Sequence, residues 1–248
     1  MEAITQGPRF LPSGDTALVV EFGDRIDRRL SAAVIGLAER IRGADLGGVT
    51  ETVPTFRSLL VHYDPLATSA ERLTGQISGL FSDLTGGTAA AQASGRLWRI
   101  PACHDGEFAP DLAEVAAAVG LTPDEVIALH GAERYHVYMI GFLPGFPYLG
   151  DLPEALRLPR RENPRVKVPA GSVAIAAGMT AVYPTESPGG WHLIGRTPAP
   201  LFDPRAEPPA LLRPGDAVLF EPIPRIEFER IARAVENDDY TLTPEALA

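Results

Sequence analysis

The sequence has a single cysteine, Cys103, and no long apolar run. One cysteine excludes an internal disulfide, so nothing indicates an oxidising compartment and the cytoplasm is the expected location. No apolar stretch approaches the roughly 20 residues that a membrane-spanning helix requires. Residues 1–18 carry acidic side chains without an apolar run, so a secretory signal is not expected either. Cys103 itself is interpreted as a small buried hydrophobic residue rather than a nucleophile.

Clusters of positive charge are also missing. The chain has 22 Lys and Arg against 32 Asp and Glu, which gives a net charge of −10. Nucleic acids and anionic membranes are bound through concentrated positive charge, so neither is an expected partner. The sequence also has no glycine-rich phosphate-binding motif and no His/Cys group with metal-ligand spacing. We therefore expect no metal site in this chain.

The composition that is present predicts a globular chain with many turns. Hydrophobic residues make up 45% of the 248 residues, and glycine and proline occur 24 times each, which favours short strands over a helical bundle. Residues 1–88 are predicted to form a small α+β domain with the element order β-α-β-β-α. Its strands are expected at 17–22, 49–53 and 58–63. Its two helices carry apolar stripes that include Leu30, Val34, Leu37 and Ile41, and Leu73, Ile77, Leu80, Phe81 and Leu84.

Residues 89–95, within a run of small and polar side chains, are interpreted as a linker to a mainly β domain at 96–248. Asp111 is expected to cap one short helix, and Thr122 to begin another with a capping box. A closing helix is predicted over 226–235, followed by a frayed acidic end after Glu236. Strands are expected at 97–100, 135–140, 172–176, 181–183, 192–194 and 217–220, a spacing typical of a barrel or sandwich.

Four motifs follow one another in this second part. They are Tyr138–Gly150 (YMIGFLPGFPYLG), Pro159–Arg161 (PRR), Val168–Val173 (VPAGSV) and Ser187–Pro198 (SPGGWHLIGRTP). Together with Arg57–Val61 and Tyr63–Pro65, this ordered series resembles the family variously called allophanate hydrolase subunit 1, sporulation-kinase inhibitor and the B subunit of 5-oxoprolinase. The resemblance implies an α+β N-terminal domain followed by a mainly β, cyclophilin-like barrel domain.

The resemblance also implies a function. It points to a protein that works with the related C subunit of 5-oxoprolinase and with its A subunit to open the lactam of 5-oxoproline and give L-glutamate. The reaction uses ATP, with magnesium, at a site that the sequence does not locate. Whether the chain is active alone stays open. Two alternatives are a regulatory protein that inhibits a histidine kinase and a subunit that processes allophanate or another urea-derived amide.

The candidate catalytic residues are His192, Arg160 and Lys167. Opening an amide gathers negative charge, which cations stabilise, and an imidazole can transfer protons near neutral pH. The neighbouring Arg161 and Arg165 are interpreted as solvated loop residues, and His130 as a helix-terminal one. The candidate substrate-binding residues lie around the glycine-rich turn: Arg196, Tyr183, Glu186, Gly189, Gly190 and Trp191.

A second group of residues is predicted to form a groove or a contact with a partner subunit: Phe142, Pro144, Phe146, Tyr148 and Met179. Two prolines and three aromatic rings make the 141–150 loop stiff and apolar. Met179 stands where related sequences commonly have a glutamine, and Ala177 and Ala181 stand where they have glycines. The ligand of this chain is therefore open at the sequence level.

Overall fold

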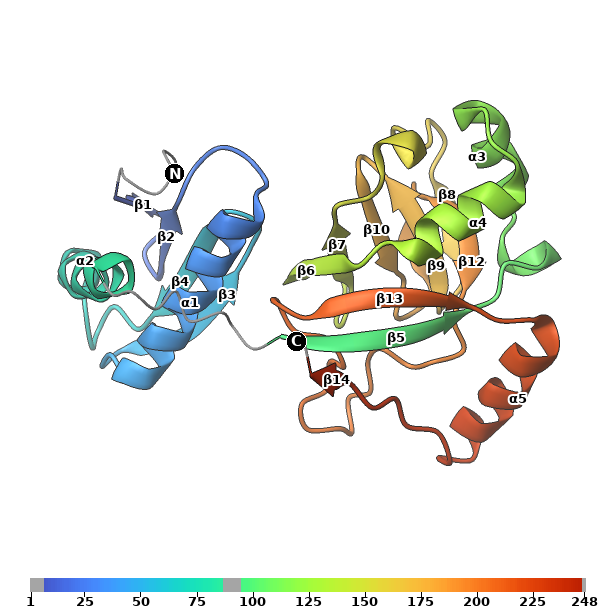
Figure 1. Ribbon diagram of the computed structural model, residues 1–248. Helices are drawn as coiled ribbons and strands as arrows, with labels where there is room; N and C mark the ends of the chain where they lie inside the picture. Colours follow the sequence, from blue (N-terminus) through green and yellow to red (C-terminus); the bar gives the residue numbers. More distant parts are fainter. Residues whose placement is uncertain (1–6, 87–94, 247–248) are drawn as a thin grey trace. The chain divides into compact units, whose positions relative to one another are not determined.

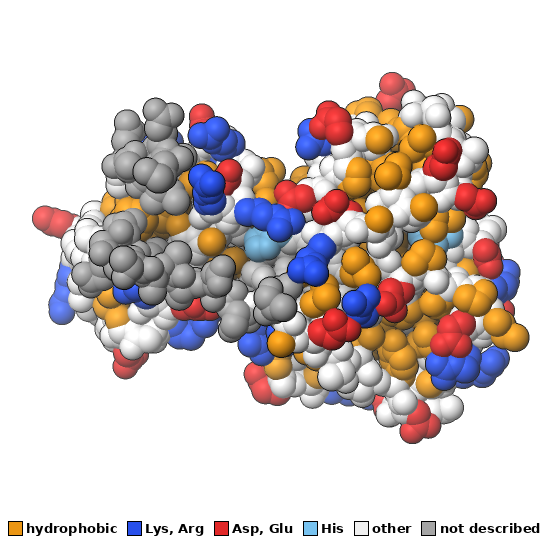
Figure 2. Space-filling view, in the orientation of Figure 1, with side chains coloured by type: hydrophobic (Ala, Val, Ile, Leu, Met, Phe, Trp, Pro, Cys, Tyr) orange, Lys and Arg blue, Asp and Glu red, His pale blue; other side chains and the backbone are white. Residues whose placement is uncertain are grey.

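The computed structural model describes residues 7–86 and 95–246 and divides into two compact units, Met1–Ser94 and Gly95–Ala248 (Figure 1). The predicted linker at 89–95 lies outside the described residues except for Gly95. In the described part of the chain, no helix is both long and apolar enough to cross a membrane. Figure 2 shows acidic and basic side chains distributed together over the visible face.

The N-terminal unit is a four-stranded antiparallel sheet in the order β1-β2-β4-β3. Alternate residues of the central strands, such as Leu18, Val20, Leu59 and Val61, pack against the apolar stripes of two helices. One face of this sheet is therefore the core face. The elements are β1 (Arg9–Pro12), β2 (Ala17–Glu21), α1 (Arg28–Ala44), β3 (Val49–Pro54), β4 (Ser58–Tyr63) and α2 (Ala70–Gly86).

Local signals account for most of this unit. The Asp27 side chain accepts hydrogen bonds from the backbone N–H groups of Arg29 and Leu30, so α1 begins at Arg28. The helix ends where Asp45 adopts a left-handed conformation. The sequence did not predict β1, whose four residues pair with β2 in the register Arg9↔Glu21. Its pattern is short and lacks regular alternation, so the pairing itself defines the strand.

The C-terminal unit is built on an eight-stranded mixed sheet in the order β12-β9-β10-β7-β6-β13-β5-β14. A separate two-stranded ribbon, β11-β8, accompanies it. The strands are β5 (Arg96–Ala102), β6 (Tyr135–Ile140), β7 (Pro147–Gly150), β8 (Arg165–Val168), β9 (Ser172–Ala176), β10 (Met179–Val182), β11 (Ser187–Gly189), β12 (His192–Arg196), β13 (Ala217–Pro222) and β14 (Glu245–Ala246). The helices are α3 (Leu112–Val119), α4 (Pro123–Ala132) and α5 (Arg225–Glu236), with short 3-10 turns at Gly106–Phe108 and Glu154–Leu156.

The first and the penultimate strand of this unit, β5 and β13, lie side by side and run parallel (Figure 1). Just beyond β5, Cys103 forms an isolated antiparallel bridge with Arg196, the last residue of β12. Their backbone groups exchange two hydrogen bonds of 2.8 Å each. This bridge joins the β12 edge of the sheet to the chain that leaves β5 near the opposite edge.

The sheet separates two apolar clusters. The larger one gathers side chains such as Trp98, Val137, Ile175 and Phe220. The smaller one, on the other side of β9 and β10, contains Phe146, Val168, Ala174, Ala176, Ala181, Tyr183, Trp191 and Leu193. All five residues of β9 are buried because the strand faces a cluster on each side. The run SVAIA is accordingly apolar on both faces.

Two expectations about this unit are wrong, and some strands were missed. The acidic end does not fray throughout, because Glu245 pairs with Leu97 of β5 and its carboxylate accepts a 2.7 Å hydrogen bond from Arg99. The strands β7, β8 and β11 were not expected. Asp111 does precede α3, but its side chain makes no cap hydrogen bond. By contrast, the capping box of Thr122 and Glu125 at the start of α4 is confirmed.

Candidate functional site

A cavity of about 300 Å³ opens beside α3 in the C-terminal unit. Its walls come from α3, from the loop at 158–163 and from the start of β12: Glu114, Val115, Ala118, Leu158, Pro159, Arg160, Arg161, Glu162, Asn163 and His192. Two of the predicted catalytic residues, Arg160 and His192, therefore lie on one cavity. A partly apolar pocket with a few converging charged groups is the usual form of a small-molecule site.

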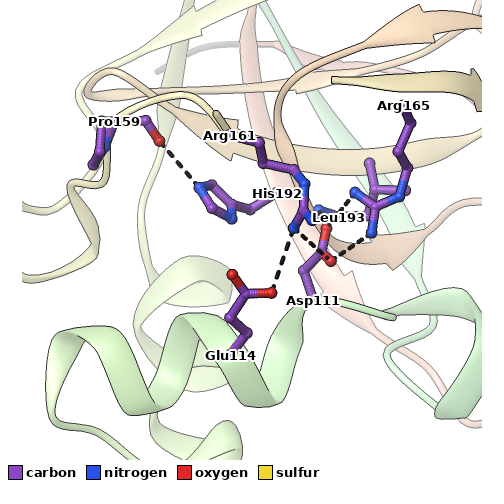
Figure 3. Close-up of polar contacts among 7 residues, drawn as sticks. All are labelled: Asp111, Glu114, Pro159, Arg161, Arg165, His192 and Leu193. Atoms are coloured by element: carbon purple, nitrogen blue, oxygen red, sulfur yellow. Dashed lines mark hydrogen bonds and ion pairs between the residues drawn. The ribbon is translucent and has the colours of Figure 1, made fainter. Parts of the chain in front are cut away.

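The glycine-rich turn positions the loop that carries the arginines. The backbone N–H of Arg161 donates a 2.8 Å hydrogen bond to the carbonyl of Gly190. Two residues further along the chain, Nε2 of His192 contacts the carbonyl oxygen of Pro159 at 3.0 Å. A carbonyl only accepts, so Nε2 carries a hydrogen, and in the neutral tautomer with that hydrogen Nδ1 holds the lone pair. Figure 3 shows the imidazole between Pro159 and the Arg161 guanidinium.

A buried carboxylate, Asp111, holds one of the arginines of this site in place. It accepts 2.6 and 2.8 Å hydrogen bonds from the Arg165 guanidinium, one of 3.1 Å from Arg161 and one of 2.7 Å from the backbone N–H of Leu193. Its side chain is 3% exposed. Burial opposes its ionisation, but the hydrogen bonds and positive charge around it prevail and hold the pKa of Asp111 below its usual value.

The expectation that Arg161 and Arg165 are solvated is wrong. Their side chains are 22% and 26% exposed, and both donate to Asp111. Arg161 also reaches Glu114 of α3 at 3.4 Å, so one guanidinium nitrogen is shared by two carboxylates (Figure 3). Sequence reasoning missed Asp111, Arg161 and Glu114 as site residues. The available signal was a pair of arginines four residues apart with one acid, Glu162, between them, so that two buried arginines would require a distant acidic partner.

Lys167 and Glu186, predicted as catalytic and substrate-binding, contact each other instead of the cavity. Their ion pair of 3.0 Å joins Lys167, in β8, to Glu186, the residue directly before β11. The Lys167 side chain is 75% exposed and that of Glu186 57%. Arg196 is also apart from the cavity. Its half-buried guanidinium lies 5.2 Å from the centre of the Phe108 ring, and burial lowers its pKa.

The remaining predicted residues form an aromatic cluster next to the cavity. Phe146 is its centre, with ring centroids 5.1 Å from Tyr148, 5.1 Å from Tyr183 and 6.2 Å from Trp191. Met179 packs against this cluster and is half-buried. Trp191 and His192 are consecutive, so Trp191 enters the cluster while His192 lines the cavity.

The segment from Gly141 to Gly150 has exposed residues near its start and buried residues after them. Phe142 is 67% exposed and meets the Phe146 ring edge to face at 5.6 Å, and Pro144 is exposed beside it. Burial raises the pKa of Tyr148 and of Tyr183, while the positive charge of Arg160 acts in the opposite direction on both. The charge of Arg160 therefore acts on the aromatic cluster as well as on the cavity.

Gly189 and Gly190 have different surroundings. A Cβ atom on Gly189 would overlap the phenol of Tyr183, so the close packing of this ring requires glycine. A Cβ on Gly190 would meet nothing nearer than Pro164 at 3.6 Å. Among the residues described, no group of three or more His, Cys, Asp or Glu is arranged to hold a metal ion.

Comparison with known proteins now adds to this geometry. The family model for the carboxyltransferase domain, subdomains C and D, matches residues 8–212. The 5-oxoprolinase B subunit of Bacillus subtilis is 42% identical over 84% of this chain and 89% of its own. The protein of the same name from Escherichia coli O157:H7 is 41% identical over 84% of this chain and 93% of its own.

A solved structure and a more distant relative extend the comparison. The crystal structure of TTHA0988 is 40% identical in sequence and superposes with a TM-score of 0.74. The match covers 84% of this chain and 40% of the TTHA0988 chain, which is the longer of the two. The urea amidolyase of Lachancea kluyveri is 25% identical over 94% of this chain but only 14% of its own length. This module thus occurs both as a separate chain and within larger proteins.

Proposed function

Because the chain belongs to the carboxyltransferase subdomain C and D family, we propose that it is the B subunit of a 5-oxoprolinase, an assembly that opens the lactam of 5-oxoproline to give L-glutamate. The observation that carries the proposal is the 42% sequence identity to the 5-oxoprolinase B subunit of Bacillus subtilis, over 89% of the length of that protein. We further propose that the sheet closes as a cyclophilin-like barrel. The hydrogen-bonded bridge between Cys103 and Arg196 supports this closure.

Ring opening adds one water across the lactam. The carbon–nitrogen bond breaks, the carbonyl carbon gains a hydroxyl that ionises as the new carboxylate, and the nitrogen gains a proton to leave as the amine. In the proposed role, Nδ1 of His192 takes the proton that the attacking water gives up and passes it to the leaving nitrogen, because Nε2 is already engaged with Pro159. Arg160 stabilises negative charge at the mouth of the same cavity.

ATP with magnesium is proposed as co-substrate of the assembled complex rather than as a ligand of this chain. The described residues offer no cluster of His, Cys, Asp or Glu for a metal ion, and the sequence has no phosphate-binding glycine motif. These residues do not fit a magnesium–nucleotide site. The proposed reaction therefore requires the related C subunit together with the A subunit of the enzyme.

The test is reconstitution with purified proteins. The full chain is combined with the C and A subunits, and glutamate release from 5-oxoproline and ATP is measured. Release from the mixture, and little from any one component, is the expected result. No release, while a 5-oxoprolinase complex from another organism is active in the same assay, would refute the proposal. Parallel assays with urea and allophanate test the alternative raised by the distant urea amidolyase relatives.

Variants in the same mixture test the individual roles. We expect Arg160→Ala and His192→Gln to lower turnover about tenfold or more, since a charge-stabilising or proton-transferring group typically contributes at least that much. Lys167 lies outside the cavity, and its predicted catalytic role requires that Lys167→Ala also lower turnover. Wild-type turnover in any of these variants would remove that residue from the mechanism. The relatives reported above carry no name that refers to a kinase, so no kinase partner is proposed.

A further inference from the structure

Two nitrogen atoms on residues that line the cavity are buried without a hydrogen-bond partner in the described part of the protein. They are Nε of Arg161 and Nδ1 of His192. His192 as a whole is 9% exposed. Polar atoms that are shielded from solvent are nearly always hydrogen-bonded, because leaving one unpaired costs its desolvation. A bound ligand that pairs with both nitrogens would remove that cost.

The two nitrogens require opposite kinds of hydrogen-bond partner, one an acceptor and the other a donor. Nε of Arg161 always carries a hydrogen, so it needs an acceptor, and a guanidinium favours an anionic one. Nδ1 of the neutral His192 ring carries a lone pair, since Nε2 donates to Pro159. It therefore needs a donor. A complementary ligand presents both an anionic oxygen and an N–H or O–H group.

We infer that the cavity binds a small carboxylate with an N–H on the adjacent atom, with its carboxylate on Arg161 and its N–H on Nδ1 of His192. This rests on the proposed function, because 5-oxoproline has this arrangement: its carboxylate is attached to the carbon next to the lactam nitrogen. The orientation places the lactam nitrogen, which must gain a proton on ring opening, against the imidazole.

Glu114 contacts the same guanidinium at another nitrogen, Nη1, so its negative charge competes with a ligand carboxylate for Arg161. Its contact with Nη1 of Arg161 is long, 3.4 Å, and its side chain is 65% exposed, so it can swing into solvent. Asp111 is different, because it is 3% exposed and held by several donors. Asp111 is therefore the fixed positioning residue of Arg161, and Glu114 is a replaceable internal competitor.

This division of roles predicts a gain of binding, which a purely structural Glu114 would not produce. Glu114→Gln keeps the size of the side chain and removes one negative charge from the cavity wall. We expect about fivefold to tenfold tighter binding of 5-oxoproline to the full chain in calorimetric titrations, because the repulsion between the carboxylates of Glu114 and the ligand is lost. Glu154→Gln is the matched control, because Glu154 pairs with Arg157 on the surface and is 83% exposed.

Two further comparisons identify the groups involved. Arg161→Gln is expected to weaken 5-oxoproline binding at least tenfold, with folding checked by circular dichroism. The lactam 2-pyrrolidone, which lacks the carboxylate, is expected to bind wild-type and Glu114→Gln proteins equally. If Arg161→Gln does not fold, the Glu114→Gln and 2-pyrrolidone comparisons still decide the question.

Unchanged or weaker binding in Glu114→Gln, equal gains for both ligands, or no binding of 5-oxoproline to the wild-type chain would each overturn the inference. These results are distinguishable from failure of the proposed function. Glutamate release by the reconstituted complex without the Glu114→Gln effect would leave the function and remove this binding mode. The expected binding pattern without glutamate release would leave the site and remove the function.

Discussion

The buried histidine of α4 makes the stability of the C-terminal unit depend on pH. His130 is 0% exposed, stacks on Phe220 with ring centroids 4.8 Å apart, and has Nε2 2.9 Å from the Thr180 hydroxyl. That hydroxyl donates to the carbonyl of Ala174, so the imidazole is the donor to it. Burial disfavours the charged ring and lowers the pKa of His130 to about 3.

The sign of the effect follows from proton binding. Above pH 6.5, the ordinary pKa of histidine, the ring is neutral in both the folded and the unfolded chain. Between there and about pH 3, the unfolded chain binds a proton that the folded chain does not. Each pH unit then removes about 1.4 kcal/mol of stability. At pH 5 the loss from this single residue is about 2 kcal/mol relative to pH 7.5.

The assay is urea unfolding followed by tryptophan fluorescence. Both tryptophans, Trp98 and Trp191, belong to the C-terminal unit, so the signal reports that unit. His130→Gln retains a donor toward Thr180 and removes the titrating ring. We expect it to be less stable at pH 7.5, because the stacking is lost, but to lose about 2 kcal/mol less than wild type on going to pH 5.

A histidine of the other unit provides the control. His62→Gln changes the N-terminal unit, which neither tryptophan reports, and should leave the wild-type pH dependence intact. Burial also lowers the pKa of His104. Because His104 is present in wild type and in both variants, its contribution to the pH dependence cancels when their stabilities are compared. Parallel stability–pH curves for wild type and His130→Gln would refute the reasoning about His130.

Two further predictions concern the site. Asp111→Asn should destabilise the C-terminal unit by about 3 kcal/mol in the same urea assay, because it leaves two part-buried arginines without their carboxylate. Glu186→Gln, at an exposed ion pair, should cost under about 1 kcal/mol. Equal losses in the two variants would contradict the structural role of Asp111. Gly189→Ala should cost about 1–3 kcal/mol by displacing the Tyr183 ring, whereas Gly190→Ala should be near neutral, and a reversed order would show that the tyrosine packing is misjudged.

Local signals in the sequence predicted the elements that depend on local interactions. The stripe of Leu30 to Ile41 and the capping box at Thr122 depend on neighbours within four residues, and both are present. The strands β8 and β11 were missed because they are four and three residues long and exist through their pairing. No periodicity can be read in so few residues.

The same contrast applies to the site. The motifs predicted both Arg160 and His192, and the structure places them on one cavity. Asp111 was taken for a helix cap because its partners are Arg161 and Arg165, fifty or more residues away. Burial and long-range pairing, which decide whether an arginine is solvated, are not visible in a single sequence. That is also why the ion pair of Lys167 with Glu186 was not foreseen.

The parallel pairing of β5 with β13 has a consequence for synthesis of the chain. Both sheet neighbours of β5, β13 and β14, lie more than a hundred residues downstream, with Leu97 opposite Ala217 and Glu245. On the ribosome, β5 therefore emerges before its partners and waits until more than a hundred further residues have been made. The described strands of the N-terminal unit pair only with one another and can form as soon as they emerge. A nascent chain thus passes through a stage with one assembled unit and one sheet still open at β5.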